Sequence, residues 1–255
     1  MNTSVLVTGA SGRLGDAIVK ELWHRGVPFS GCGRGTAPPS FGGVWHRVNL
    51  LDGEGLDAAC EARPCVVHCA TQPDKPKNDL VALEQLIAAA RRLDLHIVFI
   101  GIAGIEDAAA HLSYYRVKLD CEHRLVTSGV RHTIVRPTIF HSFVDEVLQQ
   151  LTVGPFLLTP KMILQPMDIE FAAEEIVSRS LNPSSMQAHD ICGPQRLDTV
   201  KLVEPWLINR VSRHKLKIPL PSVGPLKALS TLRRVDGKAG GLTWSQWLTE
   251  TNVKS

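Results

Sequence analysis

Two side chains that can move a proton together, Tyr114 and Lys118, lie four residues apart. We expect a helix over 113–127, and residues four apart share one face of a helix. A free tyrosine loses its proton near pH 10, so acid or base work near pH 7 requires about 4 kcal/mol of selective stabilisation of the phenolate. A neighbouring ammonium can contribute to this stabilisation, so the pair indicates a proton-transfer site. The alternative is an ordinary helix surface with an aromatic stem and a charge.

A glycine-rich run at 8–15 can hold a phosphate group. It follows the apolar stretch at 5–7 and opens a segment with apolar residues at helical spacing, so the order is strand, glycine turn, helix. In such a turn a pyrophosphate approaches the backbone closely and lies against the free N–H groups of the helix. The implied ligand is a dinucleotide, and the alternative is a purely structural turn. The expected contact residues are Gly9, Ser11, Gly12, Arg13, Leu14 and Gly15.

The second expected strand, 27–32, runs into Gly33-Arg34-Gly35, and the chain has no acidic residue between Glu21 and Asp52. Folds that prefer NAD place an acidic residue about 20 positions after the glycines, where it binds the adenosine ribose. An arginine at this place can instead bind a ribose 2′-phosphate, and Arg13 can reach the same group. We therefore expect NADP as the cofactor, with NAD less favoured. The alternative is that Arg34 is a solvated loop charge.

Length and composition limit the classes of protein. With 255 residues, 44% of them hydrophobic and 21% charged, the chain can form one large domain or a domain with an appended lobe. No apolar run approaches the roughly 20 residues of a membrane span, and no signal sequence precedes the first strand, so we expect a cytoplasmic protein. The net charge of +3 gives no indication of nucleic-acid binding. Six cysteines without a Cys-x-x-Cys pair indicate reduced thiols, and ten histidines without ligand spacing predict no metal site.

Strand-like and helical segments alternate along the first part of the chain. This order predicts a Rossmann-type, doubly wound parallel sheet with helices on both faces. We expect residues 1–145 to form the dinucleotide-binding domain and residues 146–255 a smaller C-terminal substrate lobe, partly interleaved with the sheet. The expected strands are 5–7, 27–32, 44–49, 65–70, 96–100, 133–137 and a short one near Ile191, and the helices after the first are 52–62, 79–92, 113–127, 143–151 and 169–181.

The glycine turn, the arginine after the second strand and the Tyr-x-x-x-Lys spacing occur in the order of a known family. Over residues 4–180 the chain resembles the short-chain dehydrogenase/reductase superfamily, specifically its atypical NmrA-like branch. The segments Val66-Val67-His68-Cys69-Ala70-Thr71 and Ile134-Val135-Arg136-Pro137-Thr138 support this resemblance. It implies that Ala70 and Thr71 line the cofactor ribose, that Lys118 holds the nicotinamide ribose, and that Pro137 and Thr138 border the nicotinamide. It also implies an adenine contact at Asn49 and Leu50, where the family usually has an aspartate in the place of Asn49.

One position departs from this family pattern. Active members end the fifth strand in a serine that polarises the substrate carbonyl, but this chain has Gly101 there. Ser113 can supply a hydroxyl instead or can cap the following helix. The change concerns catalysis and leaves cofactor binding untouched.

Three functions are consistent with these residues. The first is an NADPH-dependent reductase of a small carbonyl or a quinone, with Tyr114 as proton donor and Lys118 as its electrostatic support; a quinone can accept hydride without the serine. The second is a non-enzymatic NADP-binding sensor or regulator, and the third is a sugar-nucleotide epimerase-like enzyme. A stretch without acidic residues either forms a solvated face or binds an anionic substrate or acidic partner; its basic residues are Arg210, Arg213, Lys215, Lys217, Lys227, Arg233 and Arg234.

Overall fold

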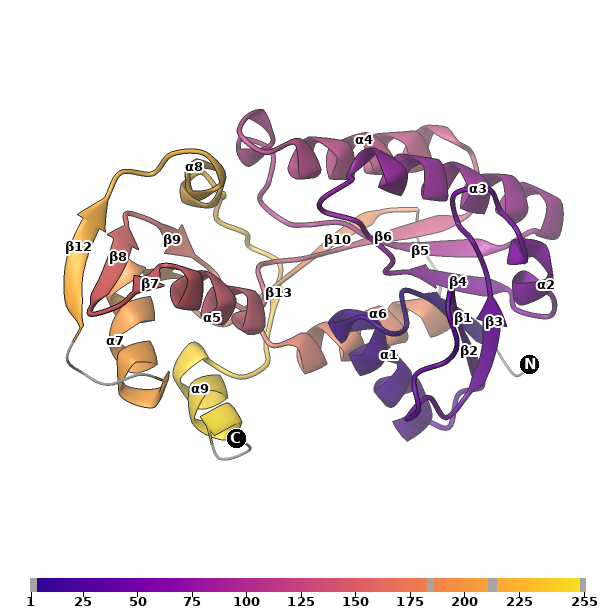
Figure 1. Ribbon diagram of the computed structural model, residues 1–255. Coiled ribbons are helices and arrows are strands. Elements are labelled where there is room, and N and C mark those ends of the chain that lie inside the picture. The colour runs from indigo at the N-terminus through magenta and orange to yellow at the C-terminus, as the bar shows by residue number, and fades with distance from the viewer. Residues whose placement is uncertain (1–3, 183–185, 211–214, 253–255) are drawn as a thin grey trace. The chain divides into compact units, whose positions relative to one another are not determined.

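The computed structural model describes residues 4–182, 186–210 and 215–252 (Figure 1). The chain divides into two compact units. The first unit comprises Met1–Gly101, Arg116–Arg136 and Ala172–His189, and the second comprises Ile102–Tyr115, Pro137–Phe171 and Asp190–Ser255. The chain passes from one unit to the other several times.

A parallel sheet forms the centre of the first unit, as the alternating sequence pattern predicts. Val5 of the first strand lies opposite Phe29 of the second on one side and Cys65 of the fourth on the other. The full order of the eight-stranded sheet is β13-β10-β6-β5-β4-β1-β2-β3. Its strands are β1 (Val5–Thr8), β2 (Phe29–Gly33), β3 (Val44–Arg47), β4 (Cys65–His68), β5 (His96–Ile100), β6 (His132–Pro137), β10 (Ala188–Cys192) and β13 (Lys238–Ala239).

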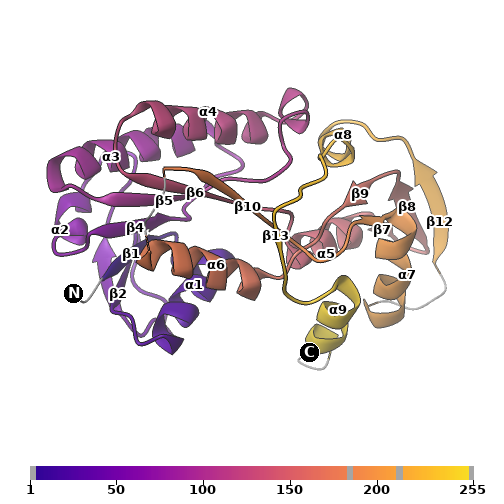
Figure 2. The same ribbon diagram turned by 180° about the vertical axis from the view of Figure 1, so that it is seen from behind.

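Helices cover both faces of this sheet. Figures 1 and 2 show α3 (Lys77–Leu93) and α4 (Ser113–Thr127) on one face, and α1 (Arg13–His24) and α6 (Ile169–Leu181) on the other. On the α3 face, Leu83 and Ile87 pack with strand residues such as Phe99 in one buried apolar cluster. The doubly wound α/β fold is therefore confirmed.

One expected helix starts later than predicted. The prediction placed Asp52 as the cap of a helix to 62, but α2 spans only Leu56–Cys60. The Asp52 carboxylate accepts the N–H of Glu54 at 3.0 Å and so stabilises a turn before the helix. Gly55, with φ of 78°, then leads into α2.

The second unit has its own apolar core. Trp206, Trp244 and Leu248 are among its fully buried side chains, so the C-terminal helix, α9 (Trp244–Asn252), packs on this core. A small sheet has the order β12-β8-β7. The elements are the 3₁₀ turn η1 (Ala108–Ala110), α5 (His141–Gln150), β7 (Thr152–Val153), β8 (Phe156–Pro160), β9 (Ile163–Leu164), β11 (Leu197–Asp198), α7 (Thr199–Arg210), β12 (Leu216–Leu220), α8 (Pro225–Ser230) and α9 (Trp244–Asn252).

Most of the basic residues near the C-terminus have acidic partners from elsewhere in the second unit. These ion pairs are Arg210 with Asp145, Lys217 with Glu204, Arg233 with Asp107 and Arg234 with Asp236. Arg213 lies outside the described residues. The pairing favours the solvated face over an anion-binding surface, because the charges are largely compensated within the unit. Among the described residues, no helix is both long enough and apolar enough to cross a lipid bilayer.

Candidate functional site

The glycine turn joins β1 to α1, and its glycines have different roles. Gly9 has φ of 67°, and a Cβ there would lie 2.7 Å from the backbone nitrogen of Ala70. A Cβ on Gly15 would lie closer than 3.0 Å to the Gly9 carbonyl oxygen, so α1 packs directly on the turn. Gly12 is the N-cap of α1 and makes no side-chain cap hydrogen bond. The first N–H groups of the helix are therefore available to an anion.

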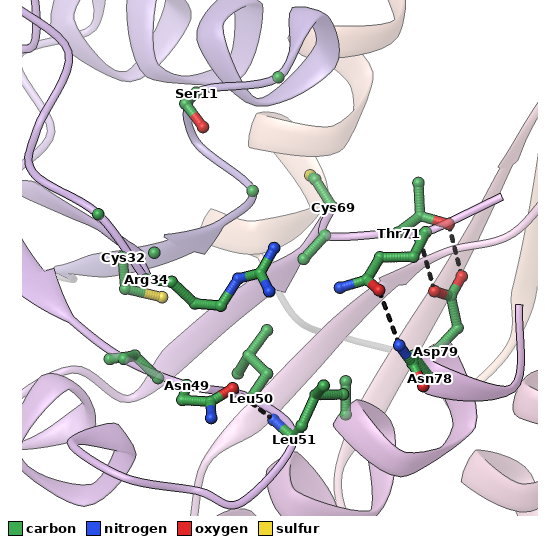
Figure 3. Close-up of a pocket in the computed structure, with 18 residues that line it drawn as sticks. Ser11, Cys32, Arg34, Asn49, Leu50, Leu51, Cys69, Thr71, Asn78 and Asp79 are labelled. Carbon is green, nitrogen blue, oxygen red and sulfur yellow. Dashed lines mark hydrogen bonds between the residues drawn. The ribbon is translucent and has the colours of Figure 1, made fainter. Parts of the chain in front are cut away.

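A pocket of about 510 Å³ lies at the carboxyl ends of β1, β2 and β4 in the first unit (Figure 3). Ligands of doubly wound folds bind at this edge of the sheet. The volume lies within the range of ordinary small-molecule sites. The pocket brings together many of the residues expected from the sequence, which are Gly9, Ser11, Gly12, Arg34, Asn49, Leu50, Ala70 and Thr71.

Two arginines flank the glycine turn. Figure 3 shows the Arg34 side chain extended into the pocket from the end of β2. Arg13 lines a second pocket of about 350 Å³, together with Lys20. Ser11 and Gly12 line both pockets, so the two adjoin at the turn. A phosphate beside Ser11 would therefore have a cation on either side.

Asn49 is held in one orientation at the edge of the pocket. Its Oδ1 accepts the N–H of Leu51 at 3.2 Å, and its Nδ2 donates to Asp52 Oδ2 at 2.5 Å. An amide oxygen has two lone pairs, so Oδ1 keeps one for a ligand donor. The geometry is compatible with the expected adenine contact.

Five of the expected cofactor residues, Lys118 among them, line neither pocket. Leu14 and Gly15 lie in the first turn of α1, half-buried and buried respectively. Pro137 and Thr138 belong to the second unit. There Thr138 is buried, its N–H donates to the Ile191 carbonyl at 3.0 Å, and its Oγ1 accepts the N–H of Gly193 at 3.3 Å. Their expected contacts with a cofactor stay predictions.

The sequence analysis missed a buried carboxylate in the pocket wall, Asp79 of α3. Its Oδ1 accepts the N–H of Gln72 at 2.8 Å, and its Oδ2 accepts the hydroxyl of Thr71 at 2.5 Å (Figure 3). Asn78 donates to the Gln72 side chain at 2.8 Å. One signal was present in the sequence: an acid in the first turn of the helix after the fourth strand, where a helix N-terminus meets the ligand crevice.

Lys118 is buried and faces this carboxylate. Its Nζ lies 3.4 Å from Asp79 Oδ2, and 5.1 Å from the centre of the Phe99 ring. Below it His68 is fully buried, with its Nδ1 2.8 Å from Thr8 Oγ1. Burial, and secondarily the Lys118 charge, lowers the pKa of His68 to about 3. His68 is therefore neutral near pH 7, and the cation at this place is Lys118.

Tyr114 precedes Lys118 by one turn of α4, as expected. Tyr114 is half-buried, whereas Tyr115 is buried. Burial, together with the neighbouring Tyr114, raises the pKa of Tyr115 to about 12. Of the two phenols, Tyr114 is thus the more exposed.

At the end of β5, where the family has a serine, the space for a side chain at Gly101 is occupied by another residue. A Cβ on Gly101 would lie closer than 3.0 Å to Glu122 Oε1 and 3.1 Å from Arg136 Cγ. Glu122 forms an ion pair with Arg136, and the Arg136 Nε lies 2.8 Å from Glu122 Oε2. The Glu122 side chain is 5% exposed. The room for a side chain at 101 is thus filled by a buried carboxylate. Ser113 is exposed as the first residue of α4.

No group of three or more His, Cys, Asp or Glu side chains among the residues that the structure describes could hold a metal ion. All six cysteines are free. Cys69 lines the pocket, and burial raises the pKa of its thiol to about 12.

Comparison with known proteins agrees with this geometry. Residues 5–115 match the NAD dependent epimerase/dehydratase family. The methionine adenosyltransferase 2 subunit beta of Pongo abelii is 30% identical over 169 residues, which are 57% of this chain and 49% of that protein. The chain thus spans about half the length of this relative.

Solved structures share the fold over almost the whole chain. A nucleoside-diphosphate-sugar epimerase from Staphylococcus aureus superposes with a TM-score of 0.79 at 18% identity, covering 96% of this chain and 99% of that one. A short-chain dehydrogenase/reductase superfamily protein from Agrobacterium tumefaciens with bound NAD superposes with a TM-score of 0.78 at 15% identity, covering 98% and 96%. Residues 5–115, which include the glycine turn, are thus similar to the NAD dependent epimerase/dehydratase family, and the chain has the fold of these solved structures.

Proposed function

We propose that this protein binds NADP(H) in the pocket of the first unit and uses it to reduce a small carbonyl or a quinone. The observation that carries the cofactor assignment is Arg34, which extends into the pocket from the end of β2, in a stretch of the sequence that has no acidic residue between Glu21 and Asp52. Arg13 adds positive charge on the other side of the turn, where Lys20 is paired with Asp16 at 2.7 Å. A guanidinium binds a ribose 2′-phosphate, whereas NAD recognition uses an acid at this place.

The residues of the pocket fit a dinucleotide. The glycine turn packs tightly, because a Cβ on Gly9 or Gly15 would clash with neighbouring backbone atoms. The start of α1 has no side-chain cap, so its N–H groups can bind a pyrophosphate. When bound, NADPH supplies the hydride. Tyr114 then donates a proton to the reduced oxygen, and Lys118 orients the ribose and stabilises the phenolate that Tyr114 becomes.

The binding test is a calorimetric titration with NADPH and NADH. We expect NADPH to bind at least tenfold more tightly, about 1.4 kcal/mol, and Arg34→Ala to remove most of this difference. Arg92→Ala is the matched control, because Arg92 is an exposed arginine of α3 outside both pockets. Equal affinities for the two cofactors in the parent protein would refute the NADP assignment.

The activity test follows NADPH oxidation with a panel of quinones, ketones and aldehydes. We expect turnover with at least one of them, and Tyr114→Phe should lower it at unchanged NADPH affinity, because the phenol acts on the substrate. NADPH binding without turnover would favour a non-catalytic regulator. Two observations support that second candidate: the relative at 30% identity is a transferase subunit, and Glu122 fills the space of a side chain at Gly101.

A third candidate is a sugar-nucleotide enzyme, because proteins with this fold include sugar-nucleotide epimerases. Fold alone does not transfer a substrate. Tight binding of a UDP-sugar in the presence of NAD would favour this candidate over the reductase. The NmrA-like branch, the cytoplasmic location and a small-molecule substrate bound by the second unit belong to the same proposal.

A further inference from the structure

We infer that Asp79 and Lys118 together bind the ribose diol in the nicotinamide half of the dinucleotide. The carboxylate accepts a hydrogen bond from one hydroxyl, and the ammonium donates to the other. This inference rests on the proposed function and adds to it a cofactor residue, Asp79, that the sequence analysis did not assign.

The two charges form a buried ion pair, and Asp79 of this pair lines the pocket. The side chains of Asp79 and Lys118 are 3% and 6% exposed, with Nζ 3.4 Å from Oδ2. A buried ion pair contributes little net stability compared with apolar residues of the same size. Because stability alone is a weak reason for such a pair, a ligand that uses both charges is the better explanation.

The carboxylate of Asp79 is held in place by the loop after β4. The Gln72 N–H binds Oδ1 and the Thr71 hydroxyl binds Oδ2. An ionised carboxylate has about four acceptor sites, so these bonds and the ammonium leave room for a hydroxyl donor. Such fixed geometry suits a ligand whose two hydroxyls have a fixed spacing.

The position of Asp79 in the pocket assigns it to the nicotinamide half. Figure 3 shows Asn49 and Arg34 on one side of the pocket and Thr71 and Asp79 on the other. Arg34 and Asn49 would hold the adenosine with its 2′-phosphate, and the glycine turn the pyrophosphate. The remaining ribose then lies on the side of Asp79.

The test compares NADPH with adenosine 2′,5′-bisphosphate, which has the adenosine and 2′-phosphate but no second ribose. Asp79→Asn keeps the size of the side chain and removes its charge. We expect this variant to bind NADPH at least tenfold more weakly and the bisphosphate within twofold of the parent. Asp120→Asn makes the same change at an exposed carboxylate of α4 outside both pockets and should bind both ligands within about threefold of the parent.

The outcomes separate the two proposals. If the parent binds neither NADPH nor the bisphosphate, the proposed function fails. If the parent binds both and Asp79→Asn weakens both equally, or neither, the role of Asp79 is wrong. If Asp79→Asn does not fold, the double variant Asp79→Asn with Lys118→Met is used, because it leaves no unpaired buried charge. Its affinities for NADPH and for the bisphosphate are compared in the same way. Parent-like NADPH affinity in that double variant would overturn the inference.

Discussion

Adding a single methyl group at Gly101 tests the packing at the end of β5. The φ of Gly101 lies outside the left-handed region. At a compatible position, glycine to alanine stabilises a protein by about 0.4–1 kcal/mol, because the unfolded chain loses freedom. Here the new Cβ would lie closer than 3.0 Å to Glu122 Oε1, so the carboxylate must retreat by roughly 1 Å from its place beside Arg136. The sign of the effect therefore reverses.

We expect Gly101→Ala to lower the free energy of unfolding by about 2 kcal/mol, within the range for overpacked sites. For a chain of this size that corresponds to a fall in Tm of about 4–8 °C. Urea titration and thermal melting measure both quantities. Gly35→Ala is the control, since a Cβ there meets no atom within 4 Å. That variant should be neutral or slightly stabilised.

A double-mutant cycle with Glu122→Ala isolates the clash. Arg136 is 27% exposed, so it can turn to solvent when Glu122 is removed. The combination of Gly101→Ala and Glu122→Ala should be more stable than the sum of the single changes predicts, by about 1–2 kcal/mol. Additive effects, or a Gly101→Ala variant as stable as the parent, would refute the reasoning. The same packing predicts that Gly101→Ser gains no carbonyl reductase activity, because its hydroxyl must first displace the carboxylate.

Two further predictions concern the glycine turn and pH. Gly12→Val should keep the fold by circular dichroism, because a Cβ at Gly12 would lie 3.3 Å from its nearest neighbour, the Gly9 carbonyl oxygen. The same variant should lose NADPH binding in calorimetry, because Gly12 lines the pocket. Gly15→Ala should instead distort the turn, since its Cβ would clash with the Gly9 carbonyl oxygen. Burial lowers the pKa of His68 to about 3 and that of His96 to about 4, so the unfolded chain binds more protons between those values and about 6.5. The free energy of unfolding should thus fall as pH drops from 6.5 to 5, by about 2 kcal/mol for His68 alone; a flat urea-unfolding profile over that interval would contradict this.

The sequence alone determined the features that depend on neighbouring residues. The glycine turn, the alternation of strands and helices, and the arginine at the end of the second strand are local patterns. Each reflects a conformation or a face that consecutive residues specify, so β5, α4 and α6 match their predicted bounds. Those patterns predicted the doubly wound sheet and the glycine turn that lines the pocket.

Only the tertiary structure decided which distant side chains meet. Asp79 reaches Lys118 because α3 and α4 lie on the same face of the sheet, and nothing in the spacing of the two residues predicts that distance. Glu122 fills the space beside Gly101 because α4 packs against the end of β5. Arg233 forms an ion pair with Asp107, which lies 126 positions away in the sequence. Contacts of this kind depend on how the faces of separate helices and strands pack, and the periodicity of residues along the chain does not specify that packing.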